Sequence, residues 1–125
     1  MLFRSQVLAA QPAFVSMATE QSANQLRALL RQAGCNGIPE IAYGPAAMIA
    51  AAKLPEVDLV LSSTVGVAGL PATYEALRCG KQVALANKEV LVAAGELVTA
   101  AAREHSIELL PVRSEERRVG KECRL

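Results

Sequence analysis

Three consecutive polar residues, Asn87, Lys88 and Glu89, stand between a short apolar run and a long alanine-rich stretch. The apolar run, Val83–Ala86, predicts a buried strand, and the stretch that follows predicts a helix. In an open parallel α/β sheet, ligands bind at the carboxyl ends of the strands. The triplet is therefore the best candidate for chemistry in this sequence.

The three side chains differ in how well they suit a helix start. Asn87 is a favourable N-cap and Glu89 suits the positive end of the helix dipole, whereas Lys88 opposes that dipole at a cost of about 0.3–1 kcal/mol. One interpretation is a capped helix with a solvated lysine. The other is a binding site in which the ammonium meets a phosphate or an anionic oxygen, and the amide and carboxylate recognise amide or hydroxyl groups.

A second candidate is the loop Ser63–Gly69, which follows an expected strand at Val57–Ser62. Its Gly66-x-x-Gly69 spacing is only a fragment of a dinucleotide-binding fingerprint, and no complete GxGxxG occurs in the chain. The loop is either an ordinary strand-to-helix turn or part of a cofactor groove. In the second case Ser62, Ser63, Thr64 and nearby backbone amides would line the groove.

The other reactive residue types form no constellation. The single histidine, His105, is expected near a helix C-terminus in a structural or exposed position. Cys35, Cys79 and Cys123 lack metal-ligand spacing and indicate free thiols in a reducing, cytoplasmic compartment. No catalytic residue and no metal ligand is assigned.

The elements that would position the triplet alternate between strands and helices, which predicts an α/β fold with a parallel sheet and flanking helices. Helix Leu70–Arg78 precedes the triplet's strand, and Leu91, Ala94, Leu97, Val98 and Ala101 are expected to face inward from the helix after it. Further strands are expected at Phe14–Ala18, Glu40–Tyr43 and Ile107–Val112, and further helices at Thr19–Ala33 and Gly44–Ala52.

Composition bounds the class of protein. A chain of 125 residues with 52% hydrophobic and 3% aromatic residues suits one small domain of helices packed on a sheet. Its net charge of +1 gives no indication of a nucleic-acid or anionic-membrane partner. No apolar run approaches the ~20 residues of a membrane helix, and the start of the chain shows no signal-peptide cleavage pattern.

The two ends differ from the rest. Residues 113–125 are densely charged and aperiodic, and RSEERRVGKEC back-translates into a synthetic sequencing adapter; LFRS, at Leu2–Ser5, back-translates into the reverse complement of the same oligonucleotide. We therefore expect residues 1–5 and 113–125 to be adapter-derived and residues 6–112 to be the natural segment. The ends carry six basic and three acidic residues, so the segment 6–112 has a net charge of −2.

The run from Val57 to Val98 resembles the NADPH-binding domain of 1-deoxy-D-xylulose 5-phosphate reductoisomerase. The resemblance rests on GVAGL at Gly66–Leu70, on Gly80-Lys81 and on LANKE at Leu85–Glu89. It implies a partial Rossmann-like sheet, and an enzyme that isomerises and reduces 1-deoxy-D-xylulose 5-phosphate to 2-C-methyl-D-erythritol 4-phosphate in non-mevalonate isoprenoid synthesis. By the same resemblance Asn87 and Glu89 contact NADPH, and Lys88 contacts the phosphorylated sugar.

The resemblance also implies a divalent metal (Mg or Mn) and a homodimer, and it has gaps. The family's first strand-turn-helix with its fingerprint would lie before Gln6. The metal-binding D-S-E after LLPV is replaced by Arg113-Ser114-Glu115, which we leave unassigned. In a sheet ordered 3-2-1-4-5-6, loss of strands one and two deprives strand three of its neighbour and opens an edge on strand four. We expect an inactive and marginally stable fragment.

Two other functions stay open from the sequence. Another NAD(P)-dependent Rossmann oxidoreductase would share the strand, glycine loop and helix, although such sugar dehydrogenases usually carry E-K-P at the position of Asn87–Glu89. A non-enzymatic α/β binding module is the third possibility, and it predicts no fingerprint upstream of this segment.

Overall fold

The computed structural model describes residues 2–35 and 37–112, so the expected adapter tail at 113–125 lies outside the described residues. Helices and strands alternate along nearly the whole described chain, as predicted. The elements are α1 (Leu2–Ala10), β1 (Phe14–Met17), α2 (Glu20–Gln32), β2 (Glu40–Tyr43), α3 (Gly44–Lys53), β3 (Leu59–Ser62), α4 (Leu70–Arg78), β4 (Gln82–Leu85), α5 (Lys88–Glu104) and β5 (Leu109–Pro111).

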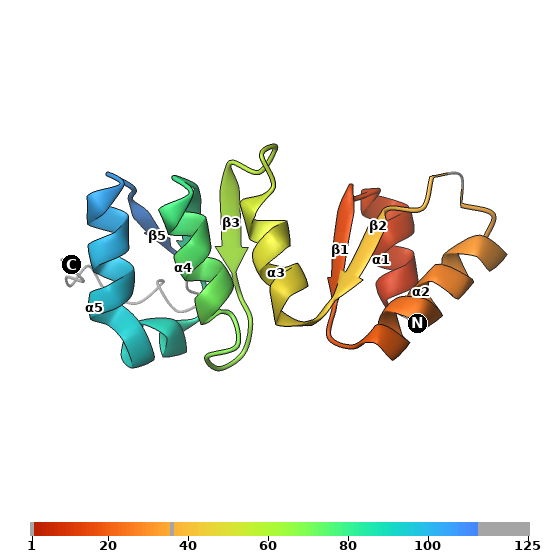
Figure 1. Cartoon of the computed structure of the whole chain (residues 1–125), viewed down its shortest axis with the longest axis horizontal. Helices are drawn as coiled ribbons and strands as arrows, with labels where there is room; N and C mark the ends of the chain where they lie inside the picture. Colours follow the sequence, from red (N-terminus) through yellow and green to blue (C-terminus); the bar gives the residue numbers. More distant parts are fainter. Residues whose placement is uncertain (1, 36, 113–125) are drawn as a thin grey trace.

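The strands form two separate sheets, and every pairing is parallel. Strands β1 and β2 make a two-stranded sheet, and β3, β4 and β5 make a three-stranded sheet in that order. Helix α3 lies between the two sheets in the elongated molecule (Figure 1). The predicted parallel α/β class is thus confirmed, with the strands divided between two sheets.

The first region has a small core of its own. Met17 of β1 and Ile41 of β2 are buried against Leu26 and Leu30 of α2, and Val7 of α1 belongs to the same cluster. Helix α1 had not been predicted. Val7 is its one buried hydrophobic residue among those whose side chains are described, so the segment carries little amphipathic pattern.

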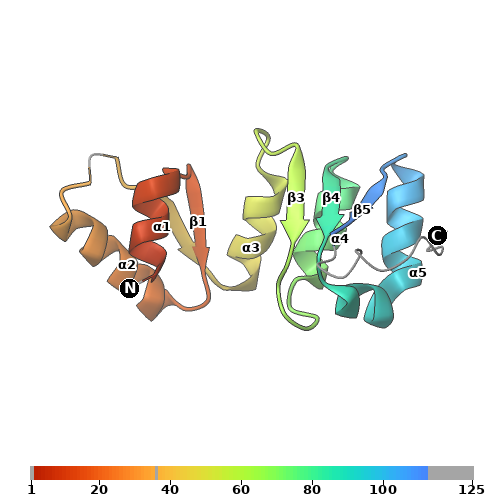
Figure 2. The same cartoon turned by 180° about the vertical axis from the view of Figure 1, so that it is seen from behind.

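The second region has the larger core. Val83 and Leu85 of β4 are buried with Leu77 of α4 and with Val90 and Val98 of α5. Helix α4 lies in front of this sheet in Figure 1 and behind it in Figure 2, so it covers one face. Strand β4 is central and has all three of its apolar residues buried, so the position of its carboxyl end is fixed by the core.

Helix α5 corrects one prediction. Leu97 was expected to face inward, but it is 48% exposed, whereas Val90 is fully buried. The cause is a kink at Ala94, whose φ of −148° and ψ of 35° are not helical. The turns before and after a break in helical geometry no longer share one face, so a single period of 3.6 residues placed Leu97 wrongly.

Strand β3 is the open edge of its sheet, because within the described residues it pairs only with β4. One face of the strand is uncovered as well. Its alternate residues Leu59 and Leu61 are 49% and 59% exposed, although both faces of a parallel sheet are normally covered. A groove of about 290 Å³ runs beside this strand, with walls from α3, α4 and the loop after β3. The open edge that the truncated sheet predicts is therefore present at β3.

Polar contacts join the helices of the second region. Lys81 Nζ donates to the carbonyl oxygens of Leu54 (2.8 Å) and Pro55 (3.3 Å), at the end of α3. Glu75 of α4 pairs with Lys53 of α3 at 3.2 Å and with Arg78 at 3.2 Å. The hydrogen bond from Lys53, more than the charge of Arg78, lowers the pKa of Glu75 below its ordinary value. These contacts hold α3 against α4.

Candidate functional site

The structure places the polar triplet where the sequence predicted it, at the carboxyl end of β4 and the start of α5. Asn87 is the N-cap of α5, with φ −109° and ψ 108°, and its Oδ1 accepts from the backbone N–H of Glu89 at 2.8 Å. Lys88 and Glu89 form the first turn of the helix. The predicted N-cap is confirmed.

Lys88 and Glu89 are both exposed. Neither of the ion pairs found within the described part of the chain involves them. A lysine at the first helical position without an anionic partner remains opposed by the helix dipole. The two charged side chains are thus free to meet a ligand at this end of the sheet.

Asn87, in contrast, is 5% exposed, and both N–H groups of its side chain are engaged. Its Nδ2 donates to the carbonyl oxygen of Thr64 and, at 2.6 Å, to that of Gly66. Both carbonyls belong to the loop between β3 and α4. The structure therefore brings the two candidate stretches of the sequence together, and the buried amide of Asn87 joins them.

The same loop is anchored from its other side. Ser62 Oγ lies 2.8 Å from Thr73 Oγ1, and Thr73 Oγ1 donates to the carbonyl oxygen of Gly69 at 2.8 Å. Because that bond uses the only proton of the Thr73 hydroxyl, Ser62 is the donor of the pair. Ser62 reaches the groove beside β3, but its hydroxyl already serves this buried network. Ser63 is exposed and Thr64 is half-buried.

Glycine is required at two points of the loop. Gly66 has a φ of +70°, a conformation that other residues adopt at a cost. A Cβ on Gly69 would lie 3.1 Å from Cβ of Thr64 and 3.2 Å from its Oγ1, which is closer than ordinary contact. The fragmentary Gly-x-x-Gly spacing thus marks a tight turn.

The remaining candidates lie elsewhere. His105 is the exposed C-cap of α5, as expected from its position, and the described cysteines, Cys35 and Cys79, are free thiols. The described residues contain no group of three or more His, Cys, Asp or Glu side chains able to hold a metal ion. Among residues 2–35 and 37–112, none of the helices combines the length and apolarity of a membrane span.

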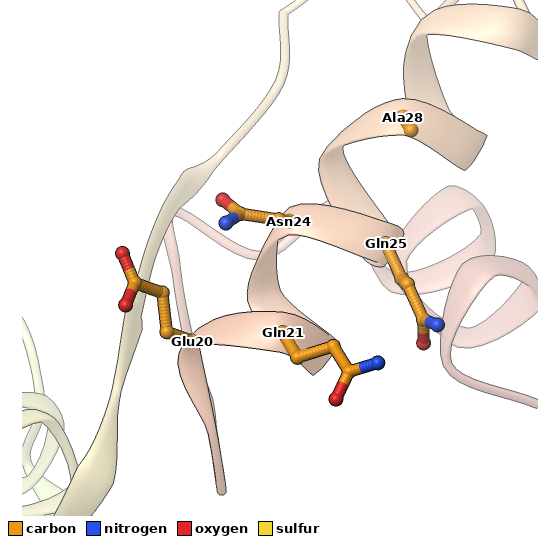
Figure 3. A pocket seen from close by; sticks show the side chains of 5 residues that line it. All are labelled: Glu20, Gln21, Asn24, Gln25 and Ala28. Atoms are coloured by element: carbon orange, nitrogen blue, oxygen red, sulfur yellow. The ribbon is translucent and has the colours of Figure 1, made fainter.

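A depression on the outer face of α2 is larger than the groove beside β3, but it offers no convergent chemistry. Glu20 and Asn24 extend to one side of the helix, and Gln21 and Gln25 extend to the other (Figure 3). Asn24 also accepts a hydrogen bond from Arg27 at 2.7 Å. These exposed polar side chains form a solvated helix face remote from the triplet.

A parallel α/β sheet with a glycine loop and a polar triplet at neighbouring strand ends is typical of the Rossmann-like class of domains. Comparison with known proteins specifies the family. The chain belongs to the 1-deoxy-D-xylulose 5-phosphate reductoisomerases, because the model of that family matches residues 1–95.

Individual relatives are also reductoisomerases. The reductoisomerase of Symbiobacterium thermophilum is 52% identical over 110 residues, which cover 88% of this chain and 28% of the relative. A crystal structure of DOX-P reductoisomerase in complex with magnesium matches 91% of this chain and 28% of its own, with 33% identity and a TM-score of 0.83. Another, in complex with NADPH, fosmidomycin and magnesium, matches 87% of this chain and 26% of its own, with 33% identity and a TM-score of 0.79.

The chain thus spans little more than a quarter of the length of its relatives. The family match confirms the resemblance seen in the sequence. It also decides against an unrelated Rossmann oxidoreductase and against a non-enzymatic module as the family of origin.

Proposed function

We propose that this segment is part of the NADPH-binding domain of a longer reductoisomerase, which converts 1-deoxy-D-xylulose 5-phosphate to 2-C-methyl-D-erythritol 4-phosphate. The observation that carries the proposal is the exposed Lys88–Glu89 pair at the end of the most deeply buried strand, beside a loop held in place by hydrogen bonds. The relative solved in complex with NADPH, fosmidomycin and magnesium supports NADPH as the cofactor.

The residue roles follow the chemistry of the triplet. Lys88 binds an anionic oxygen of the phosphorylated sugar, because its ammonium is exposed and otherwise unfavourable at a helix start. Glu89 and Asn87 contribute to NADPH binding. Glu89 is an exposed hydrogen-bond acceptor, and Asn87 acts from a buried position. When bound, NADPH supplies the hydride for the reduction.

The magnesium of the related structures has no matching cluster of ligands in the described residues. We assign no metal ligand among the described residues, and we propose from the family resemblance alone that residues outside 6–112 hold the divalent metal of the full-length enzyme.

We further propose that the isolated 125-residue chain is inactive and binds NADPH poorly. The open edge of β3 and the division of the strands into two sheets support this, because a Rossmann-like groove needs neighbouring strands on one continuous sheet. We also propose, from the back-translation of the two ends, that residues 6–112 are the natural segment and that residues 1–5 and 113–125 are adapter-derived. The nucleotide record tests that assignment, since codons at both ends that differ from the adapter would contradict it.

Free thiols at Cys35 and Cys79 support a reducing, cytoplasmic location for the full-length enzyme. We also propose that the enzyme is a homodimer, as the family resemblance implies. Sedimentation of the full-length protein tests the oligomeric state, and a monomer would contradict the proposal.

A chimaera tests the function. Residues 6–112 replace the matching segment of the Symbiobacterium thermophilum relative, and NADPH-dependent turnover of 1-deoxy-D-xylulose 5-phosphate is measured. We expect turnover by the chimaera and only weak NADPH binding by the isolated chain in calorimetry. Tight binding by the isolated chain, or a folded chimaera that does not bind NADPH, would contradict the proposal.

Within the chimaera, Lys88→Met removes the ammonium and keeps the length of the side chain. Loss of a charged hydrogen bond to substrate costs about 1.5–3 kcal/mol, or roughly tenfold to a hundredfold in kcat/KM. The matched control is Arg103→Met, which removes an exposed cation from the last turn of the same helix that takes part in neither ion pair of the described residues. An equal loss in both variants would show that Lys88 has no special role.

A further inference from the structure

The side chain of Asn87 has no hydrogen-bond donor left for a ligand. Its two N–H groups donate to the carbonyl oxygens of Thr64 and Gly66, and its Oδ1 already accepts from the N–H of Glu89. A carboxamide has two donors and one acceptor oxygen with two lone pairs. Only one lone pair of Oδ1 remains, on a residue that is 5% exposed.

These three bonds connect elements that are far apart in the sequence. Thr64 and Gly66 belong to the loop after β3, whereas Asn87 and Glu89 stand at the start of α5. The last main-chain hydrogen bond between β3 and β4 runs from the Ala86 N–H to the Ser62 carbonyl, at 2.9 Å. Beyond that point, the side-chain amide of Asn87 supplies the hydrogen bonds that join the carboxyl ends of β3 and β4.

The rest of the loop depends on the same connection. The Thr64 side chain packs against Gly69, so that holding the Thr64 carbonyl also holds the glycine turn. The loop is therefore tied on the α5 side by Asn87 and on the α4 side by Thr73, whose hydroxyl donates to Gly69. Val65 lies between the two carbonyls that Asn87 binds and is 90% exposed.

We propose that Asn87 is a positioning residue, which holds the backbone of residues 64–66 and the first turn of α5 as one rigid unit. This rests on the proposed function, because the rigid unit is what presents Lys88, Glu89 and the loop to the sugar phosphate and NADPH. Asn87 acts on the cofactor through the loop, and its side-chain amide donates no hydrogen bond to NADPH.

Two variants of the chimaera separate the bonds. Asn87→Asp keeps an N-cap oxygen for the Glu89 N–H but has no donor for the two carbonyls. Asn87→Ser keeps a cap and is too short to span to the loop. In both we expect hydrogen-exchange protection of the Leu70 N–H, which closes the loop by donating to the Val67 carbonyl at 3.0 Å, to fall about tenfold or more. The reason is that the loop loses two buried hydrogen bonds, while the amides of β4 stay protected.

KM for NADPH is the second measurement, because a residue that only stabilised the fold would not change it selectively. We expect KM for NADPH to rise about tenfold in both variants, with kcat changed much less. Loss of protection throughout β4, or unchanged protection of the loop, would overturn the positioning role. An unsubstituted chimaera that folds without binding NADPH would contradict the proposed function instead, so the two failures are distinguishable.

Discussion

Strand β4 has a neighbour on each side, whereas β1 and β2 have only each other within the described residues. All three apolar residues of β4 are buried, but in β1 only Met17 is buried. A strand held on both sides has little freedom in register or direction, so a side chain that follows it is placed well. The candidate site stands at the end of β4. The first region has free thiol Cys35 and the polar face of α2, but no comparable group of side chains.

The two regions also differ in how they complete a core. The second has ten buried residues in one cluster and the first has six, which include Val7 from the unpredicted helix α1. Because burial of apolar surface is the main stabilising contribution, we expect the second region to be the more stable. The variants below test whether the two regions differ in stability.

The largest effect is expected from the two fully buried leucines. Leu77→Ala and Leu30→Ala each leave a cavity and should cost about 2–5 kcal/mol, with the larger loss at Leu77. Hydrogen exchange of the 125-residue chain should show each loss confined to its own region. The control is Val92→Ala, because Val92 is 83% exposed. Equal loss of protection in both regions from either variant would show one cooperative unit.

A smaller effect is expected from the buried hydroxyl of Thr73. Thr73→Val keeps the shape of the side chain but leaves the Ser62 hydroxyl without its acceptor, and an unsatisfied buried donor costs about 1–3 kcal/mol. Urea unfolding measures the loss, and Thr73→Ser, which keeps the hydroxyl, should recover most of it. A valine variant as stable as the parent would mean that this network does not anchor the loop.

The smallest effect on folding is expected at the open edge. Leu61→Lys should change the free energy of unfolding by less than about 0.5 kcal/mol, since Leu61 is 59% exposed. A charge on an edge strand opposes pairing with another chain, so self-association measured by light scattering should fall. Val92→Lys adds the same charge on α5 and should leave association unchanged. If both lysine variants lower self-association equally, the contact between chains does not involve the edge of β3.

Local sequence patterns were sufficient for most elements of this chain. Alternating apolar runs and turn residues predicted the five strands and four of the helices, since each such element carries its period and its boundary residues locally. The triplet at Asn87–Glu89 was found for the same reason: an N-cap after an apolar run marks a strand end. Helix α1 and the phase change at Ala94 were missed because neither has a strong local pattern.

Tertiary structure decided how these local pieces are connected. Which strands share a sheet depends on pairings between distant segments, and so does the exposure of Leu59 and Leu61. The sequence showed that Asn87 is a good cap, but not that its two donors reach a loop more than twenty residues earlier. Hydrogen bonds of that range depend on the packing of whole strands, whereas a cap depends only on the next turn of chain. The amino-acid sequence alone therefore located the candidate site, and only the fold showed that Asn87 is buried beneath it while Lys88 and Glu89 are exposed.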